Sequence, residues 1–369
     1  MKRIGLIGST GRVGQVLLKA LLRDPEITVL AGCRDPDRRQ PPDPGHVGQR
    51  YQVHKLNVFD EQKLLSFCRD VDLLINCAGP SGVLLDRVLV TAARLECPVL
   101  DPGGYDPVLS RLDALARQAG RHAAPIVVGA GLFPGLSGIY PRWLVESEDK
   151  VPDRLDVFYA GTDEWGPSSA WDIIHSTSDF GANRPPSYYD GGKLRAVPIY
   201  RAFRRVELPF PVGRVRGMLL YTEELGRLAR QLGVSQVYCH GANNGRWSGC
   251  VLALVKTLGL NQRPEQIERS AQWLSWASRR DRRLGYVPCF AIDCHATWSD
   301  HKRHAMILTG DTYEGTAAVL LCAARLILSG SWLSPSHEGP PIGMAHELFD
   351  VARFMHVFRS SDCVIREDH

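Results

Sequence analysis

Residues 2–22, KRIGLIGSTGRVGQVLLKALL, join an apolar run to three glycines spaced GxxGxxG. The apolar run 4–7 predicts a buried strand, and the apolar residues of 13–21 recur at helical spacing. A second strand-like run, 27–32, follows. A strand, a glycine turn, a helix and a second strand in this order favour a turn that binds a dinucleotide. A glycine-rich turn without a ligand is the alternative, and this context disfavours it.

Each of the three glycines has its own task in such a turn. Gly8 permits the tight bend, Gly11 lets the backbone approach a pyrophosphate, and Gly14 allows the helix to pack closely on the strand. The N-terminus of the helix supplies an anion site. The candidate cofactor-binding residues of this segment are Gly8, Ser9, Thr10, Gly11, Arg12 and Val13.

The end of the second strand, AGCRDPDRR (31–39), indicates which dinucleotide binds. Enzymes that use NAD place an acidic residue there to hold the ribose hydroxyls. Here Arg34 stands at that point, followed by Arg38 and Arg39, and guanidinium groups match a 2′-phosphate by charge-assisted hydrogen bonds. We therefore predict NADP as the cofactor, with NADPH preferred over NADH. Asp35 as the ribose ligand, with the arginines in an ordinary solvated loop, is the alternative.

Strand-like and helix-like segments alternate up to residue 138, which predicts a doubly wound parallel sheet. The later strand segments are YQVHKLNV (51–58), VDLLINCAGP (71–80), CPVLDPGG (97–104) and APIVVGAGLFPGLSG (124–138). In such sheets the carboxyl ends of the strands line the cofactor crevice, and we expect the last glycine-rich loop to approach the nicotinamide. The residues placed there are Asn57, Asn76, Cys77, Ala78, Gly79, Pro80, Asp101, Gly131, Phe133 and Pro134.

The length and composition of the chain indicate its number of domains, its class of partners and its location. A chain of 369 residues with 44% hydrophobic content exceeds one core and predicts two domains. No segment concentrates the net charge of +4, which argues against nucleic-acid binding. The longest apolar run, 315–328, is too short to span a membrane and contains Arg325, so we expect a buried helix. Ten cysteines without CxxC pairs predict buried thiols, and without a signal peptide the expected location is cytoplasmic.

The motifs GSTGRVG, NCAGP, LDPGG and GAGLFPGLSG, in this order, resemble those of the saccharopine dehydrogenase-like reductases. Residues 176–198 and the C-terminal order of strand, buried helix and helical return are also similar, so the resemblance covers most of the chain. It implies a Rossmann-like domain at 1–134 and an inserted α/β domain with a mainly antiparallel sheet at 135–335, used for substrate and dimer contacts. It further implies a C-terminal helical return onto the first domain at 336–369, and a homodimer.

The same resemblance implies hydride transfer between NADP and a carbon bonded to nitrogen, an imine in one direction and an amine in the other. An amino-acid-like substrate would carry a carboxylate, which arginines could hold unless they form a solvated basic face. The lysine-pathway reductases have an acidic residue shortly after the glycine-proline-glycine turn, where this chain has Ser137. We therefore expect a small-molecule imine other than the saccharopine precursor. The arginines are Arg201, Arg204, Arg205, Arg214 and Arg216.

One proton must be managed along with the hydride. The segment that the resemblance brings over the cofactor offers His175, Asp179, Tyr188 and Tyr189 as catalytic candidates, and histidine is the natural proton shuttle near neutral pH. Water is the alternative donor. The alternative function is a non-catalytic NADP-binding sensor or scaffold, since such domains can bind nucleotide without reacting. The polar composition of 160–193 favours an active site.

A YxxxK pattern, Tyr189 with Lys193, matches the catalytic pair of short-chain dehydrogenases. That pair works one turn apart on a helix. Gly191 and Gly192 between the two residues disfavour a helix and predict a turn, so we regard the match as accidental.

A second pattern, near the end of the inserted domain, has the composition of a zinc site. Alternation along CFAIDCHATW (289–298) points Cys294 and His295 to opposite faces of a strand, and SDHKR reads as the tip of a hairpin. We therefore predict no metal. The set considered is Cys289, Cys294, His295, His301 and His304.

Overall fold

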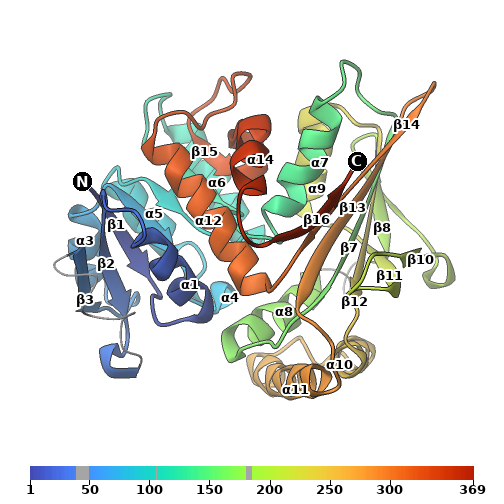
Figure 1. The fold of residues 1–369 in the computed structure, drawn as a ribbon, viewed down its shortest axis with the longest axis horizontal. Coiled ribbons are helices and arrows are strands. Elements are labelled where there is room, and N and C mark those ends of the chain that lie inside the picture. The colour runs from blue at the N-terminus through green and yellow to red at the C-terminus, as the bar shows by residue number, and fades with distance from the viewer. Residues whose placement is uncertain (39–49, 105, 180–184) are drawn as a thin grey trace. The chain divides into compact units, whose positions relative to one another are not determined.

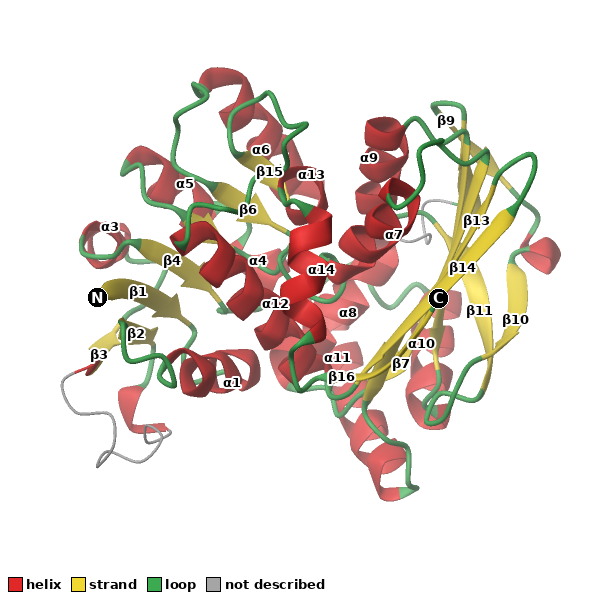
Figure 2. Ribbon diagram, turned by 45° about the horizontal axis from the view of Figure 1, so that its top comes forward, coloured by secondary structure: helices red, strands yellow, loops and turns green. Residues whose placement is uncertain are grey.

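The computed structural model describes residues 1–38, 50–104, 106–179 and 185–369. The chain forms two compact units. Unit 1 comprises residues 1–136 and 313–361, and unit 2 comprises residues 137–312 and 362–369. Helices, strands and both termini are labelled in Figure 1, and Figure 2 colours the same chain by secondary structure.

Unit 1 contains a parallel sheet, in which seven strands are found among the described residues. The strand order is β15-β6-β5-β4-β1-β2-β3, and each neighbouring pair is parallel. This arrangement confirms the predicted doubly wound sheet. The strands are β1 (Lys2–Ile7), β2 (Ile27–Cys33), β3 (Tyr51–Lys55), β4 (Leu73–Asn76), β5 (Val99–Leu100), β6 (Ile126–Val128) and β15 (Ile342–Met344).

Helices pack on this sheet through apolar side chains. On one face, Leu64, Leu89 and Leu112 from three helices join the strand residues Leu74 and Val99 in one core cluster. Parallel strands buried in this way read as near-continuous apolar runs, as β1 and β4 do. The helices are α1 (Arg12–Leu21), α3 (Glu61–Arg69), α4 (Ser81–Leu84), α5 (Arg87–Arg94), α6 (Asp106–Gln118), α12 (Thr312–Leu328), α13 (Ala345–Leu348) and α14 (Val351–Arg359), with the 3₁₀ turn η1 (Pro36–Arg38).

Unit 2 contains a mixed, mainly antiparallel sheet, as the resemblance implied. Its strand order is β10-β11-β12-β7-β13-β14-β16, with β8 pairing to β12 and to β9. Only the β12–β7 pair among the described strands is parallel. The strands are β7 (Arg154–Thr162), β8 (Ser187–Asp190), β9 (Lys193–Ala196), β10 (Phe203–Glu207), β11 (Arg214–Leu220), β12 (Gln236–Asn243), β13 (Cys289–Thr297), β14 (Lys302–Thr309) and β16 (Val364–Asp368).

The helices of unit 2 form two groups. Figure 1 shows α7 and α9 beside the sheet, while α8, α10 and α11 gather at one end. The second group has its own apolar cluster, which includes Ile174, Val255 and Leu274. The helices are α7 (Leu136–Glu146), α8 (Pro167–Asp179), α9 (Glu223–Leu232), α10 (Arg246–Leu258) and α11 (Pro264–Arg283), with the 3₁₀ turn η3 (Ile199–Arg201).

The two units divide the chain differently from the expected ranges 1–134, 135–335 and 336–369. From Tyr313 onward, α12 belongs to unit 1, where Gly315 lies against Leu132; a methyl group at Gly315 would be 2.6 Å from Leu132 Cδ1. The last residues also leave unit 1, because β16 pairs with β14 and so satisfies the backbone groups of that edge strand. Neither of these long-range contacts can be predicted from the order of segments along the chain.

Helices of the described segments are all too short or too polar to cross a membrane. The apolar run 315–328 lies within α12, with Ala317, Val319 and Leu320 buried, as expected for a core helix. Eight of the ten cysteine side chains are buried, in agreement with their expected use as small apolar groups.

A buried carboxylate joins two helices of unit 2. Asp281 on α11 is 1% exposed and accepts hydrogen bonds from the backbone nitrogens of Trp247 and Ser248, each at 2.8 Å, at the start of α10. The Ser248 hydroxyl donates a third bond, at 2.7 Å. Because Gly245 at the N-cap of α10 has no side chain, Asp281 supplies the cap from another helix.

We predict that Asp281→Ala lowers the free energy of unfolding by about 2–4 kcal/mol, because two buried donors and one half-buried donor lose their acceptor. Urea unfolding followed by circular dichroism measures the loss. Glu268→Ala, at an exposed position of the same helix, is the control and should change little. Equal stability of the two variants would show that the cap does not hold α10 to α11.

Candidate functional site

The glycine turn of unit 1 is built by backbone contacts that exclude side chains. Gly8 has φ +78°, and a methyl group there would lie 2.5 Å from the backbone nitrogen of Ala78. A methyl group at Gly14 would lie 2.3 Å from the carbonyl oxygen of Gly8. The turn is closed by hydrogen bonds from Gly8 N to Gly32 O, 2.8 Å, and from Gly11 N to Gly8 O, 2.9 Å. Two of the three glycine roles read from the sequence thus have a steric basis here.

The N-terminus of α1 follows this turn and is suited to an anion. Its N-cap is Gly11, which makes no side-chain cap, and the first turn contains no acidic residue. The first backbone N–H groups of a helix have no intrahelical acceptor, and the helix dipole favours negative charge there. The side chain of Arg12 lies over the Tyr313 ring, 3.8 Å from the centroid, and Ser9 is buried with its hydroxyl 3.4 Å from Gly32 O. Thr10 and Val13 are half-buried beside the turn.

Arg34 and Asp35 directly follow β2, the strand beside β1. Both side chains are exposed, and Asp35 Oδ1 accepts a hydrogen bond from Asp37 N at 3.3 Å, within the turn η1. Arg39 and the side chain of Arg38 lie outside the described residues. Of the three arginines expected to bind the 2′-phosphate, Arg34 is therefore the one whose placement is known.

Asn76 and Asp101 end β4 and follow β5, and they bind each other. Asn76 Nδ2 donates to Asp101 Oδ2 at 2.6 Å, while Asp101 Oδ1 accepts from Gly103 N at 2.7 Å. Burial raises the pKa of Asp101, although the bonds from Asn76 and Gly103 oppose the shift. Asn76 Oδ1 also accepts from Ala78 N at 3.2 Å. Asn76 and Asp101 therefore hold the loops at the carboxyl edge of the sheet. Asn57 is exposed, and its side-chain oxygen accepts a hydrogen bond from the backbone N–H of Phe59.

The loops after β4 and β6 carry the remaining cofactor candidates. Cys77, Ala78, Gly79 and Pro80 are all half-buried. After β6, Gly131 N donates to Pro134 O at 3.0 Å, and Gly131 is itself buried. Phe133, between them, is exposed. These residues form compact loops at the sheet edge where the cofactor is expected.

Two of the four proposed proton donors are on α8. His175 is half-buried and its ring stacks on Trp171, with centroids 4.9 Å apart and an interplanar angle of 16°. Asp179 is the last residue of the helix, and its side chain is outside the described part of the structure.

The other two donors are on β8 and point to opposite faces. Tyr188 stacks on Tyr238 of β12, with centroids 4.3 Å apart, whereas Tyr189 is buried. Lys193 begins β9, and the two glycines between the strands have φ +54° and +88°. The YxxxK match is therefore a hairpin turn, as predicted.

A carboxylate absent from the sequence pattern lies beside Ser137. The Ser137 hydroxyl on α7 donates to Glu224 Oε2 at 2.5 Å, and both side chains are buried. Tyr159 of β7 donates to Ser137 O at 2.7 Å. The carboxyl group that residue 137 itself lacks is thus supplied from α9. No motif spacing signals this contact, because 87 residues separate the two side chains.

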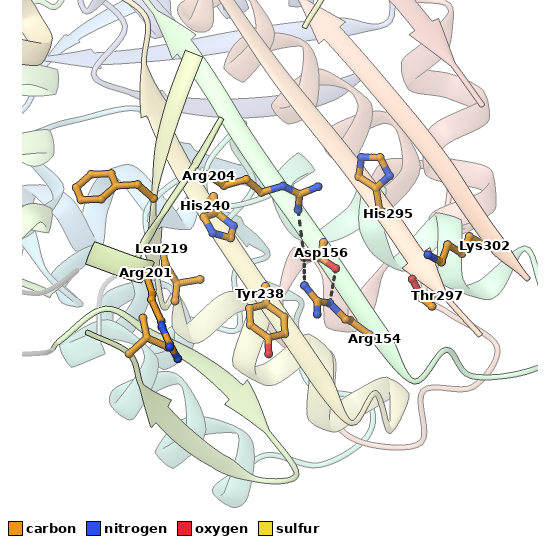
Figure 3. Close-up of a pocket in the computed structure, with 12 residues that line it drawn as sticks. Arg154, Asp156, Arg201, Arg204, Leu219, Tyr238, His240, His295, Thr297 and Lys302 are labelled. Carbon is orange, nitrogen blue, oxygen red and sulfur yellow. Dashed lines mark hydrogen bonds and ion pairs between the residues drawn. The ribbon is translucent and has the colours of Figure 1, made fainter. Parts of the chain in front are cut away.

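A cavity of about 590 Å³ opens on one face of the unit 2 sheet (Figure 3). Four cationic side chains line it, against a single carboxylate. Arg201 and Arg204 of the predicted arginine set are among them, while Arg205, Arg214 and Arg216 are not. The lining residues are Arg154, Asp156, Val197, Arg201, Phe203, Arg204, Leu219, Tyr238, His240, His295, Thr297 and Lys302.

Asp156 holds two of these arginines. Arg154 makes two bonds to it, with Nε 2.6 Å from Oδ2 and a second nitrogen 2.7 Å from Oδ1, and Arg204 reaches Oδ1 at 3.2 Å. The bonds to Asp156 raise the pKa of Arg154. Arg154 also lies over the Tyr238 ring, 4.0 Å from its centroid. The guanidinium groups are therefore fixed by contacts on the sheet.

A second polar group is centred on Asp293, a residue that the sequence reasoning did not consider. Its two oxygens contact His295 Nε2 at 3.2 Å and His304 Nε2 at 2.6 Å, and the two imidazole rings stack with centroids 4.5 Å apart. Burial would raise the pKa of Asp293, but the bonds from the two histidines outweigh it and lower the pKa. Three ligand atoms within 4.8 Å of one another could also hold a metal ion.

The other members of the suggested zinc set lie elsewhere. Cys294 is buried and alternates with His295 along β13, so the two side chains point to opposite faces. His301 stacks on Trp298, with centroids 4.5 Å apart, and contacts Asp300. Four cationic residues line the cavity that His295 borders, and their field opposes a divalent cation. The absence of a metal stays a prediction.

Comparisons with known proteins identify the dinucleotide domain. Residues 4–123 match the family model described as the saccharopine dehydrogenase NADP binding domain. Saccharopine dehydrogenase (L-Glu forming) from Saccharomyces cerevisiae has a similar structure, with a TM-score of 0.65 and 13% identity over 100% of this chain and 99% of that chain. The search of curated protein sequences returned no match.

Two further solved structures are less similar. A probable dehydrogenase from Thermotoga maritima gives a TM-score of 0.47 at 10% identity, covering 97% of this chain and 95% of its own. The WlbA dehydrogenase from Thermus thermophilus gives 0.41 at 13% identity, covering 97% and 93%. The domain match supports the predicted resemblance for residues 4–123, which carry the saccharopine dehydrogenase NADP binding domain, and the chain shares its fold with the yeast enzyme.

Proposed function

We propose that the protein is an NADP-dependent oxidoreductase that transfers a hydride to or from the carbon of a C=N or C–N bond in an amino-acid-like substrate. The observation that carries this proposal is the turn of Gly8, Gly11 and Gly14, which has no room for a side chain at Gly8 or Gly14 and lies inside the matched NADP-binding domain. NADP bound there supplies or accepts the hydride, and the protein provides binding, orientation and proton transfer.

The chain's own residues would divide the binding task. The backbone N–H groups at the start of α1 face the pyrophosphate, and Arg34 holds the 2′-phosphate, which favours NADPH over NADH. Asn76 and Asp101 do not contact the cofactor in this proposal. They keep the loops 77–80 and 101–104 in place through their mutual bond.

In the reductive direction the C=N carbon receives a hydride and its nitrogen receives one proton. We propose that the proton comes from one of His175, Asp179, Tyr188 and Tyr189, and we favour His175, because it is half-buried and its ring orientation is fixed by Trp171. The cytoplasmic location and the homodimer remain predictions. A sensor that binds NADP without turnover is the competing function.

The Arg34→Ala variant tests the cofactor preference. Losing a charge-assisted contact should weaken NADPH binding roughly 10- to 100-fold and leave NADH binding unchanged. Fluorescence titration with each nucleotide measures both affinities. Arg117→Ala, an exposed arginine on α6, is the matched control. An unchanged ratio in Arg34→Ala, with weaker NADH binding in Asp35→Ala, would instead make Asp35 the ribose ligand.

The Gly11→Ala variant tests whether the turn binds a pyrophosphate. A methyl group at Gly11 would meet only Gly8 O, at 3.2 Å, and the carbonyl oxygen of Cys77, at 3.9 Å, so the chain should fold. The methyl group would occupy the approach to the pyrophosphate and weaken NADPH binding about tenfold. Gly120→Ala, where nothing lies within 4 Å, is the control. Normal NADPH affinity in Gly11→Ala would contradict this role for the turn.

Turnover is tested by following NADPH oxidation against amino acids paired with oxo acids and against cyclic imines. With a reacting substrate, His175→Gln should lower kcat about 100-fold, leave NADPH binding unchanged, and remove the corresponding limb of the pH profile. Tyr188→Phe is the comparison variant. NADPH binding without turnover across the whole panel would support the sensor, and an unaltered pH profile in His175→Gln would remove His175 as the donor.

A further inference from the structure

The cavity of unit 2 has a marked excess of positive charge. Arg154, Arg201, Arg204 and Lys302 line it, and Asp156 is the single acidic residue among the lining side chains. Asp156 is already shared by Arg154 and Arg204. Within the described part of the chain, no carboxylate pairs with Arg201 or Lys302. These two cationic groups at the cavity therefore have no carboxylate partner among the described residues.

A buried histidine reinforces this arrangement. His240 is 7% exposed, lines the same cavity, and stacks on Phe158 with an interplanar angle of 14°. Its Nδ1 has no hydrogen-bond partner among the described residues. Burial and the charge of Arg204 lower the pKa of His240 to about 4, so the ring is neutral at physiological pH. A neutral imidazole can donate one hydrogen bond without adding to the repulsion among the cations.

The site is concave, and its size fits a small molecule rather than the flat surface of a partner protein. Its volume of about 590 Å³ falls in the range of small-molecule pockets. Most of the lining side chains come from neighbouring strands of one sheet, while Val197 and Arg201 come from the segment before β10. Figure 3 shows Arg204, His240, Arg154 and Asp156 on the strands around the hollow. Leu219 and Tyr238 add apolar surface. Guanidinium groups on a rigid sheet match planar or tetrahedral oxyanions.

A solvated basic face is the competing explanation of the arginines. It accounts for Arg214, which is exposed and pairs with Glu207 at 3.2 Å, and for Arg216, whose guanidinium lies over Phe203. It does not account for a concave site at which Arg201 and Lys302 lack a carboxylate partner among the described residues.

We infer that this cavity binds a small dianion, a dicarboxylate or a phosphate, with Arg201 and Lys302 neutralising its charge and His240 donating a hydrogen bond to it. Arg154 and Arg204, held by Asp156, complete the oxyanion surface. The inference does not depend on the proposed hydride transfer, because every residue of the site belongs to unit 2 and the glycine turn belongs to unit 1.

Isothermal titration calorimetry of the full chain tests the inference with succinate, inorganic phosphate and the uncharged succinamide. We expect both dianions, or one of them, to bind and succinamide not to bind. The preferred dianion identifies the chemical source of the ligand. Arg201→Gln should weaken binding about tenfold, because one charge-assisted contact is lost. His240→Phe should also weaken binding, while its ring still stacks on Phe158.

Arg205→Gln is the matched control, since it removes a nearby arginine, on β10 beside Arg204, that does not line the cavity. Its affinity should equal that of the unmodified protein. Failure of both dianions to bind, or equal losses in Arg201→Gln and Arg205→Gln, would overturn the inference. NADPH titration of the same samples separates the two proposals: dianion binding without NADPH binding would refute the proposed function and leave this site standing.

Discussion

The dinucleotide-binding unit depends on the close approach of Gly14 to the carbonyl of Gly8. A methyl group at Gly14 would lie 2.3 Å from that oxygen, well inside van der Waals contact, so no other residue leaves α1 where it is. The same constraint places the first turn of α1 directly after β1, with its N–H groups toward the turn. Gly8 adds a second close contact, to the backbone of Ala78 after β4. The packing that fixes the helix thus also creates the anion site.

The Asn76–Asp101 bond extends this arrangement across the sheet. β4 lies between β1 and β5, and the two side chains join the ends of β4 and β5 at 2.6 Å. Each also accepts a backbone N–H from its own loop. A buried polar pair whose members are all satisfied makes the geometry rigid. Residues that look like ligands in a motif can therefore also hold the backbone of the loops that follow them.

In unit 2 charged side chains, rather than backbone contacts, characterise the site, because one face of its sheet is polar around the cavity. Asp156 organises two arginines, and Asp293 organises two histidines, so each carboxylate is neutralised within the protein. The remaining charge is positive and is concentrated in a hollow. Charge on a low-dielectric, concave surface acts more strongly than the same charge spread over a solvated face. The arrangement of the strands thus gathers cationic side chains at the cavity, where they favour the binding of anions.

The sequence by itself determined the parallel sheet, the glycine turn, the position of Arg34, the buried helix around Ala317 and the hairpin at Gly191. Each of these rests on residues close together in the chain, whose periodicity, spacing or conformational freedom is visible in one short stretch.

Only the tertiary structure decided the return of β16 to the second sheet, the pairing of Ser137 with Glu224, and the cavity around His240. These features join residues separated by tens of positions, and the strand order that brings them together is set by packing over the whole unit. That strand order cannot be predicted from local sequence patterns.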